Sequence, residues 1–322
     1  MKMKSFISKA LITLISTSLL FTSLNPITAK ADSYTVVTLG ADLTQAQKEE
    51  MLKYFNVTKN DANVIEITSK EEYEALGNVA SSTQLGNKSI SSSYVEPTSS
   101  GGLDISTNNL TWVTESMIRN ALITAGIENA VVKASAPFKV SGTAALTGIL
   151  KGFENSENGS KIDTAKKDAA NEEIVVTGNL GDKIGQDDAT NLINDIKKDV
   201  IKKNPSSEKE IEKIVDKHAK SYDLSEEDRE KIQQLMVKID NLNLNYSAIK
   251  DQLNDVTNQL KDKITNVDTQ GVLTKIGNFF SDIWTAIKNL FSSDSSSNTN
   301  TTNEPKSNNN TTNQPTTTTE SK

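Results

Sequence analysis

The spacing of apolar residues in the first half of the chain predicts an α/β fold. Short runs rich in Val, Ile, Thr and Tyr predict β-strands at residues 34–39, 63–68, 89–96, 103–107 and 130–136. Apolar side chains that recur every three or four positions predict helices at residues 45–55, 71–76, 115–125 and 143–153. Helices and strands that alternate in this way indicate a mixed sheet with helices packed on it.

The sharpest part of this pattern spans residues 112–153. Thr114 is expected to cap one helix, and Gly126 is expected to end it in the left-handed conformation that glycine adopts without steric cost. Pro137 is expected to stop the following strand, because proline cannot donate to a sheet ladder. This stretch is therefore predicted to form a helix, a strand and a second helix.

The second helix of this stretch begins near Ser141, and its start has two interpretations. Backbone N–H groups at a helix amino terminus could hold an anion. No phosphate-binding glycine pattern accompanies Val140–Thr143, so a helix cap formed by Ser141 is favoured. The small residues of the helix, including Gly148, are expected to let it lie close against a flat neighbour. Capping pairs are predicted as Thr44 with Gln47, Ser69 with Glu72, and Ser207 with Glu210.

Beyond about residue 155 the patterns are helical. Helices are predicted over residues 162–174, 189–200, 207–218 and 225–267, and residues 179–188 are predicted to be a loop. From Ile232 to Val267 the apolar gaps run three and four residues, which is a coiled-coil-like seam. Residues 241–247 have poor helix propensity, so a break into two antiparallel helices is favoured over one continuous helix.

The two ends of the chain are predicted to lie outside the folded part. Lysines precede an apolar run from Leu11 to Leu24, and Ala29–Ala31 is a small-residue cleavage pattern, so residues 1–31 are interpreted as a secretory signal peptide. A retained membrane anchor is disfavoured, because the run is short for a bilayer. No later segment is apolar enough to span a membrane. The predicted parts are a signal peptide (1–31), an α/β domain (32–154), a helical domain (160–291) and a disordered Ser/Asn/Thr-rich tail (292–322).

Charge and composition exclude several classes of function. The chain has a net charge of −7, and loss of the lysine-bearing signal would make it more acidic, which argues against a nucleic-acid partner. It has no cysteine, so its fold depends on its core alone. With a single histidine and no cysteine, no metal or cofactor site is predicted.

Catalytic residues are not predicted either. His218 lies on the apolar stripe of its helix, where a half-buried packing role is favoured over a general base. No G-x-S-x-G elbow is present, although a serine–lysine pair stays open.

The segment 272–291 carries a wide apolar face. Packing on the preceding helices is favoured over docking on a membrane or a partner, since few cations flank the face. The candidate face consists of Phe279, Phe280, Ile283, Trp284, Ile287 and Phe291.

Two runs carry a family resemblance. They read VVTLGADLTQAQKEEMLKYF (36–55) and TNNLTWVTESMIRNALITAGIENAVVKASAPFKVSGTAALTGILKGFE (107–154). The chain closely resembles the YpuA-like family of secreted, uncharacterised proteins of Gram-positive bacteria. The TAGI, AP and SGTAALTGI runs are specific, and the resemblance covers most of residues 32–291. It implies a secreted or cell-surface protein and supplies no functional residues.

Three functions are compatible with these patterns. A secreted or cell-envelope-associated, non-enzymatic binding protein is favoured. The alternatives are a hydrolase-like envelope enzyme without a recognisable motif and a helical module for oligomerisation or assembly. The expected partners are accordingly a cell-envelope component or further copies of the chain joined through its helices.

Overall fold

A computed structural model describes residues 35–265, with side chains placed through residue 260. The described residues up to Lys261 belong to one compact unit. The predicted signal peptide, the apolar face of residues 272–291 and the predicted tail lie outside the described residues.

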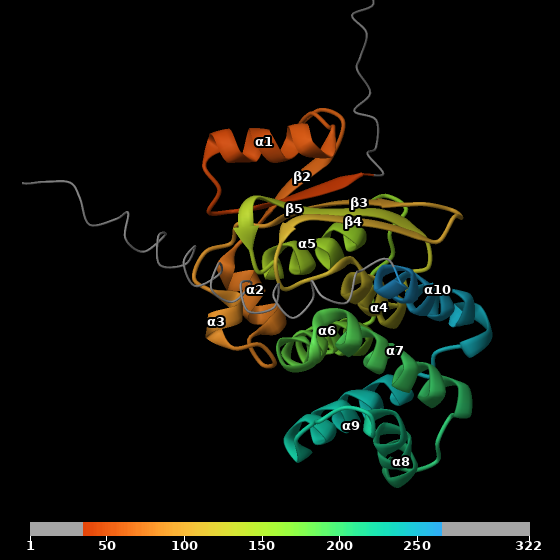
Figure 1. The fold of residues 1–322 in the computed structure, drawn as a ribbon. Coiled ribbons are helices and arrows are strands. Elements are labelled where there is room, and N and C mark those ends of the chain that lie inside the picture. Colours follow the sequence, from red (N-terminus) through yellow and green to blue (C-terminus); the bar gives the residue numbers. More distant parts are fainter. Residues whose placement is uncertain (1–34, 266–322) are drawn as a thin grey trace, which may run out of the picture. The chain divides into compact units, whose positions relative to one another are not determined.

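Five strands form one mixed sheet (Figure 1). The spatial order is β2-β1-β3-β5-β4, in which β1 is parallel to β2, β4 is parallel to β5, and β3 runs antiparallel to both of its neighbours. The strands are β1 (Val36–Gly40), β2 (Asn63–Ile67), β3 (Ser92–Pro97), β4 (Leu103–Leu110) and β5 (Ala130–Val140).

Helices alternate with these strands and then continue alone. Those of the first half are α1 (Gln45–Phe55), α2 (Ser69–Leu76), α3 (Ser82–Leu85), α4 (Glu115–Ala125) and α5 (Thr143–Glu154). Those of the second half are α6 (Thr164–Ile184), α7 (Gln186–Lys203), α8 (Glu208–Ala219), α9 (Glu226–Asn241) and α10 (Tyr246–Thr265). The predicted fold class, a mixed sheet with packed helices followed by a helical region, is confirmed.

The two faces of the sheet are covered differently. In Figure 1, α1 lies over one face while α4 and α5 lie under the other. Alternation along β1 directs Val37 and Leu39 to the α1 side, where they form a small core with Phe55. On the opposite side, a Cβ on Gly148 of α5 would lie 2.1 Å from Thr38 Oγ1, so only glycine permits this approach. The predicted close contact of this helix with a flat neighbour is confirmed.

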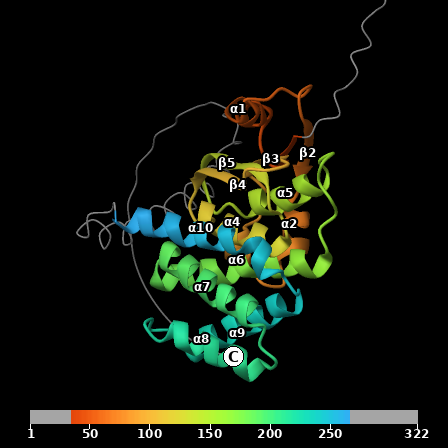
Figure 2. The same cartoon turned by 90° about the vertical axis from the view of Figure 1, so that its right-hand side faces the viewer.

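The later helices extend the second core. Helix α6 packs on α4, and α7, α8 and α9 follow beyond it (Figures 1 and 2). Every residue of α4 from Ser116 to Ala125 is buried, because the sheet covers one side of the helix and α6 covers the other. The apolar cluster runs without interruption from the strands to Leu260. The domain boundary predicted near residue 155 stays a prediction.

The loop predicted at residues 179–188 is wrong. Helix α6 continues to Ile184 and α7 begins at Gln186, with only Gly185 between them at a φ of +95°. The earlier glycines are contact positions, not helix breakers. A Cβ on Gly178 would lie 2.2 Å from the Trp112 ring.

Two predicted caps are also shifted. The capping box of α2 consists of Thr68 and Glu71, one residue before the predicted pair. The N-cap of α5 is Gly142, which provides no side-chain cap; the hydroxyl of Ser91, the residue before β3, accepts a hydrogen bond from Ala145 N at 2.8 Å. The cap therefore comes from the loop that leads into β3, and Ser141 does not form it.

The later chain holds two further corrections. Ser207 forms no side-chain cap on α8; instead the Glu210 carboxylate accepts a hydrogen bond from Ser206 N at 2.9 Å. Strand β5 continues past Pro137 to Val140. Pairing with β4 shifts register just after Ser135, so the missing N–H of the proline falls where the ladder is irregular.

The predicted break within the long seam is confirmed, since α9 ends at Asn241 and α10 begins at Tyr246. The two helices share α7 as a neighbour but contact it in different ways. Helix α9 packs on α6, α7 and α8, whereas Asn194 of α7 donates to Leu253 O in α10 at 3.0 Å. Figure 2 shows α10 lying across α7, away from α9. Among residues 35–265, no helix has both the length and the apolar character required to cross a membrane.

Candidate functional site

His218 belongs to a surface charge cluster. Its Nε2 lies 3.0 Å from Asp199 Oδ2, and Lys203 donates to the same oxygen at 2.8 Å. Burial alone would raise the pKa of Asp199, but the hydrogen bonds from Lys203 and His218 outweigh it and hold that pKa well below its usual range. The histidine is half-buried, in agreement with the packing role favoured from sequence.

A buried lysine pairs with a glutamate and a threonine inside the helical layers. Lys197 Nζ donates to Glu173 Oε1 at 2.7 Å, to Asn120 O at 2.9 Å and to Thr124 Oγ1 at 3.2 Å. Thr124 Oγ1 donates in turn to Glu173 Oε2 at 2.5 Å. Burial lowers the pKa of Lys197, and the charge of Glu173 opposes that shift.

All three donors of the Lys197 ammonium group are used, and the side chain is 0% exposed. This hydroxyl–lysine contact therefore joins α4, α6 and α7 and offers no access to a substrate. The sequence signal for it was the position of Lys197, directly after Ile196 on the apolar stripe of its helix.

A second buried acid lies at the amino end of α5. Helix α2 places Glu72 at 1% exposure, and within the described residues neither of its carboxyl oxygens has a hydrogen bond of good geometry, although the hydroxyls of Thr143 and Ser89 lie nearby. Burial raises the pKa of Glu72 to about 7; the hydroxyls of Thr143 and Ser89 oppose this shift, and the charge of Asp42 adds to it. The Ser89 hydroxyl is itself buried and without a partner among the residues described.

Asp42 fixes the loop that covers Glu72. Its Oδ2 accepts hydrogen bonds from Ser89 N at 2.7 Å and from Ser69 Oγ at 3.2 Å. The amino end of α5, considered from sequence as an anion site, thus has one of the protein's own carboxyl groups beside it.

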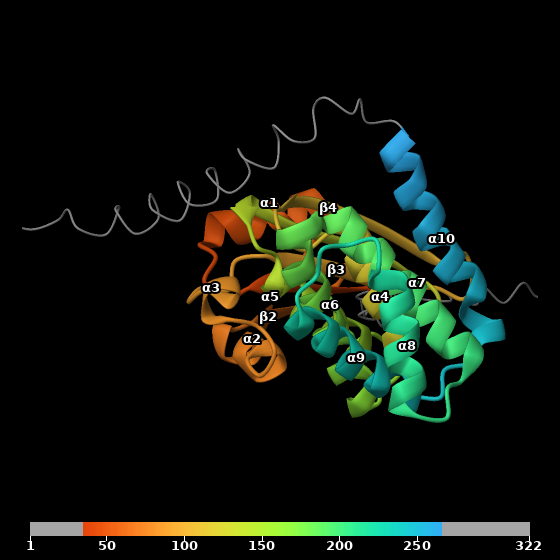
Figure 3. The ribbon, with the colours of Figure 1, turned by 60° about the horizontal axis from the view of Figure 1, so that its bottom comes forward.

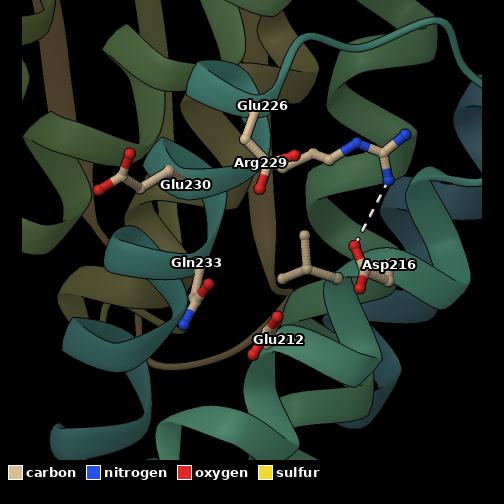
Figure 4. Close-up of a pocket in the computed structure, with 7 residues that line it drawn as sticks. Glu212, Asp216, Glu226, Arg229, Glu230 and Gln233 are labelled. Atoms are coloured by element: carbon tan, nitrogen blue, oxygen red, sulfur yellow. Dashed lines mark hydrogen bonds and ion pairs between the residues drawn. The ribbon is translucent and has the colours of Figure 1, made fainter.

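An open groove lies between the antiparallel helices α8 and α9 (Figure 4). Its volume is about 420 Å³, and buried Val215 forms part of its lining. One cation, Arg229, lies 3.4 Å from Asp216 across the groove. The polar side chains that line it are Glu212 and Asp216 from α8, and Glu226, Arg229, Glu230 and Gln233 from α9. Its charge is therefore negative.

The groove lies apart from the two buried ionisable groups described above. Neither Glu72 nor Lys197 lines the groove. Across the described part of the chain, no three His, Cys, Asp or Glu side chains gather as a metal site. The groove thus presents an open polar surface that carries exposed carboxylates.

The apolar face predicted on residues 272–291 lies beyond the described residues. Its six side chains, Phe279, Phe280, Ile283, Trp284, Ile287 and Phe291, therefore stay a prediction. The groove was not predicted, because an apolar pattern predicts where helices pack and does not show which of their outer edges are hollow.

Comparison with known proteins gives the family. The described residues form a mixed sheet continued by a helical layer. The chain belongs to the family described as "Protein of unknown function (DUF1002)", whose model matches residues 39–256, from β1 to α10. A similar curated protein is the "Uncharacterized protein YpuA" of Bacillus subtilis (strain 168), which is 39% identical over 260 residues. The alignment covers 80% of this chain and 89% of that protein. No solved structure matches the chain. The predicted YpuA-like family is confirmed.

Proposed function

We propose that the protein is exported and acts outside the cell, at its surface, as a non-enzymatic binding protein. The export part rests on residues 1–31, whose basic start, apolar run and Ala29–Ala31 pattern are typical of a secretory signal. The polar tail from residue 292 is compatible with a solvated location outside the cell.

The observation that carries the binding role is that the groove lies apart from Glu72 and Lys197, the two buried groups with shifted pKa values. Catalysis by a general acid or base requires a group with a matched pKa within reach of the bound substrate. Glu72 and Lys197, whose pKa values are shifted, are 1% and 0% exposed and lie in other parts of the fold. The α8–α9 groove, in contrast, is open to solvent and lined by exposed polar side chains.

The groove favours a ligand that carries positive charge. Its carboxylates outnumber the single guanidinium of Arg229, so a basic or amine-bearing group is attracted and an anion is repelled. A volume of about 420 Å³ accommodates a small molecule or a few side chains of a larger partner.

Turnover and binding can be distinguished directly. The chain from Asp32 onward is titrated onto isolated Gram-positive cell envelopes, and both bound protein and soluble envelope fragments are measured. We expect saturable binding without release of fragments. Release of fragments by substoichiometric protein would show an enzyme, and a failure to bind would remove the proposal.

The alternative of assembly through the apolar seam is less favoured. Ile232, Leu235 and Ile239 are each 0% exposed and belong to the core of the same chain. Their side chains are thus already used within the described unit.

A further inference from the structure

The segment formed by α2 and α3, residues 69–85, closes over the amino end of α5. Helix α2 has eight residues and α3 has four, and both lie at the edge of the described unit beside α5 (Figures 1 and 3). Gly86 ends the segment in the left-handed region, with a φ of +69°. Such short helices depend on tertiary contacts for their stability.

The carboxyl group of Glu72 lies at the centre of this segment, and no cation among residues 35–260 pairs with it. Lys151 of α5 reaches α2, but its ammonium group pairs with Glu71. The charge that Asp42 directs toward Glu72 is of the same sign. A buried carboxylate without a cationic partner is strongly disfavoured, and the nearby hydroxyls of Thr143 and Ser89 offset this only in part.

The other polar groups on or facing α2 are either uncharged or already paired. Helix α6 presents Asn171, whose amide donates to Ala75 O at 3.2 Å. The remaining charges of α2, Lys70 and Glu74, pair with each other at 3.4 Å on the solvent side.

Apolar side chains and further hydrogen bonds also hold the segment. Leu76 and Leu85 are its buried apolar anchors, at 0% and 4% exposure. The hydroxyl of Tyr73 donates to Gly86 O at 3.0 Å, and Gln84 bonds to Asn179 of α6.

We propose that residues 69–85 form a pH-dependent latch, which is closed while Glu72 is protonated and opens as its carboxyl group ionises. Opening transfers the carboxylate to water and uncovers the amino end of α5 together with Leu76. This inference is independent of the proposed binding role, since the latch and the α8–α9 groove share no residue.

The direction of the pH effect follows from the two protonation equilibria. The carboxyl group has a pKa of about 7 when closed and an ordinary value of 4.5 when open. Because the closed state binds the proton more tightly, closure is strongest below pH 4.5 and is weakened as the pH rises to 7. Between pH 5 and pH 8 the equilibrium constant for opening increases about 70-fold.

Amide hydrogen exchange of the full chain tests the latch. Protection factors for residues 69–85 are measured at pH 5 and pH 8, each corrected for the intrinsic exchange rate at that pH. We expect protection in this segment to fall up to about 70-fold. Protection in α1, which packs on the other face of the sheet, should stay constant.

Two variants assign the effect to one carboxyl group. Glu72→Gln keeps the shape of the side chain but cannot ionise, so its segment should be equally protected at both pH values. Glu74→Gln changes an exposed carboxylate of the same helix and should behave as the wild type. Equal wild-type protection at pH 5 and pH 8 would overturn the proposal, whether or not the variants fold; so would a pH-dependent loss that persists in Glu72→Gln.

Discussion

Lys197 and Glu173 form an ion pair that solvent does not reach, and the pair is stable because each group has several partners. Removing one member leaves a buried charge without compensation, which typically costs about 3–5 kcal/mol. We therefore expect Lys197→Met to lower the free energy of unfolding by about that amount in urea titrations. The exposed Lys209→Met serves as the matched control and should change it by less than about 0.5 kcal/mol.

Removing both members of the pair separates the cost of a buried, unpaired charge from the loss of side-chain packing. In Lys197→Met/Glu173→Met no buried charge remains, so much of the lost stability should return. A single Lys197 variant as stable as the wild type would contradict the assigned role of the pair.

Glu72 makes the stability of the fold depend on pH, because burial raises its pKa in the folded state. A carboxyl group whose pKa is about 7 in the folded state and 4.5 in the unfolded state stabilises the fold at low pH and loses that contribution as the pH rises through 7. The free energy of unfolding of the wild type should therefore fall between pH 5 and pH 8 by up to about 2.5 kcal/mol more than that of Glu72→Gln. Urea titrations at the two pH values measure this difference, and parallel pH profiles would exclude it.

At the scale of elements, the register of α5 on the sheet depends on glycine. A Cβ on Gly148 would lie 2.1 Å from Thr38 Oγ1, whereas one on Gly152 would lie 3.3 Å from Val95 Cγ2. Alanine favours the helix by about 1 kcal/mol at both positions, but overpacking commonly costs about 1–3 kcal/mol. We expect Gly148→Ala to lower the midpoint of thermal unfolding and Gly152→Ala to change it little. Equal midpoints for Gly148→Ala and Gly152→Ala would show that α5 can move away from the sheet without loss of stability.

Periodicity predicted most strands and helices because each depends on neighbours within a few residues. The loop predicted at residues 179–188 was wrong because Gly181 lies within α6, and the glycine just before it, Gly178, packs against the distant Trp112 ring. The apolar stripe places Lys197 inside, but the partners of Lys197 and Glu72 were not predictable, since they come from distant elements: Lys197 meets Asn120 across a separation of 77 residues. The cap that Ser91 supplies to α5 was missed for the same reason, because the two are 54 residues apart in the sequence.

At the scale of the molecule, α4 connects the sheet to the helical layers. The helix is buried on all sides, so a fragment of residues 32–158, which lacks α6, would expose one of its apolar faces. We expect this fragment to lack a cooperative unfolding transition, measured by near-ultraviolet circular dichroism against temperature. A cooperative transition in the fragment would support the domain boundary predicted near residue 155.

The central functional claim is that the groove between α8 and α9 binds a ligand at the cell surface. The most direct measurement compares envelope binding by the wild type, by Glu212→Gln/Glu230→Gln, and by Glu50→Gln/Glu157→Gln. The two double variants change net charge equally, but only the first alters the groove. We predict that the groove variant loses about tenfold or more in affinity, equivalent to about 1.4 kcal/mol, while the control binds as the wild type does. Equal binding by all three proteins would contradict the assignment of the groove.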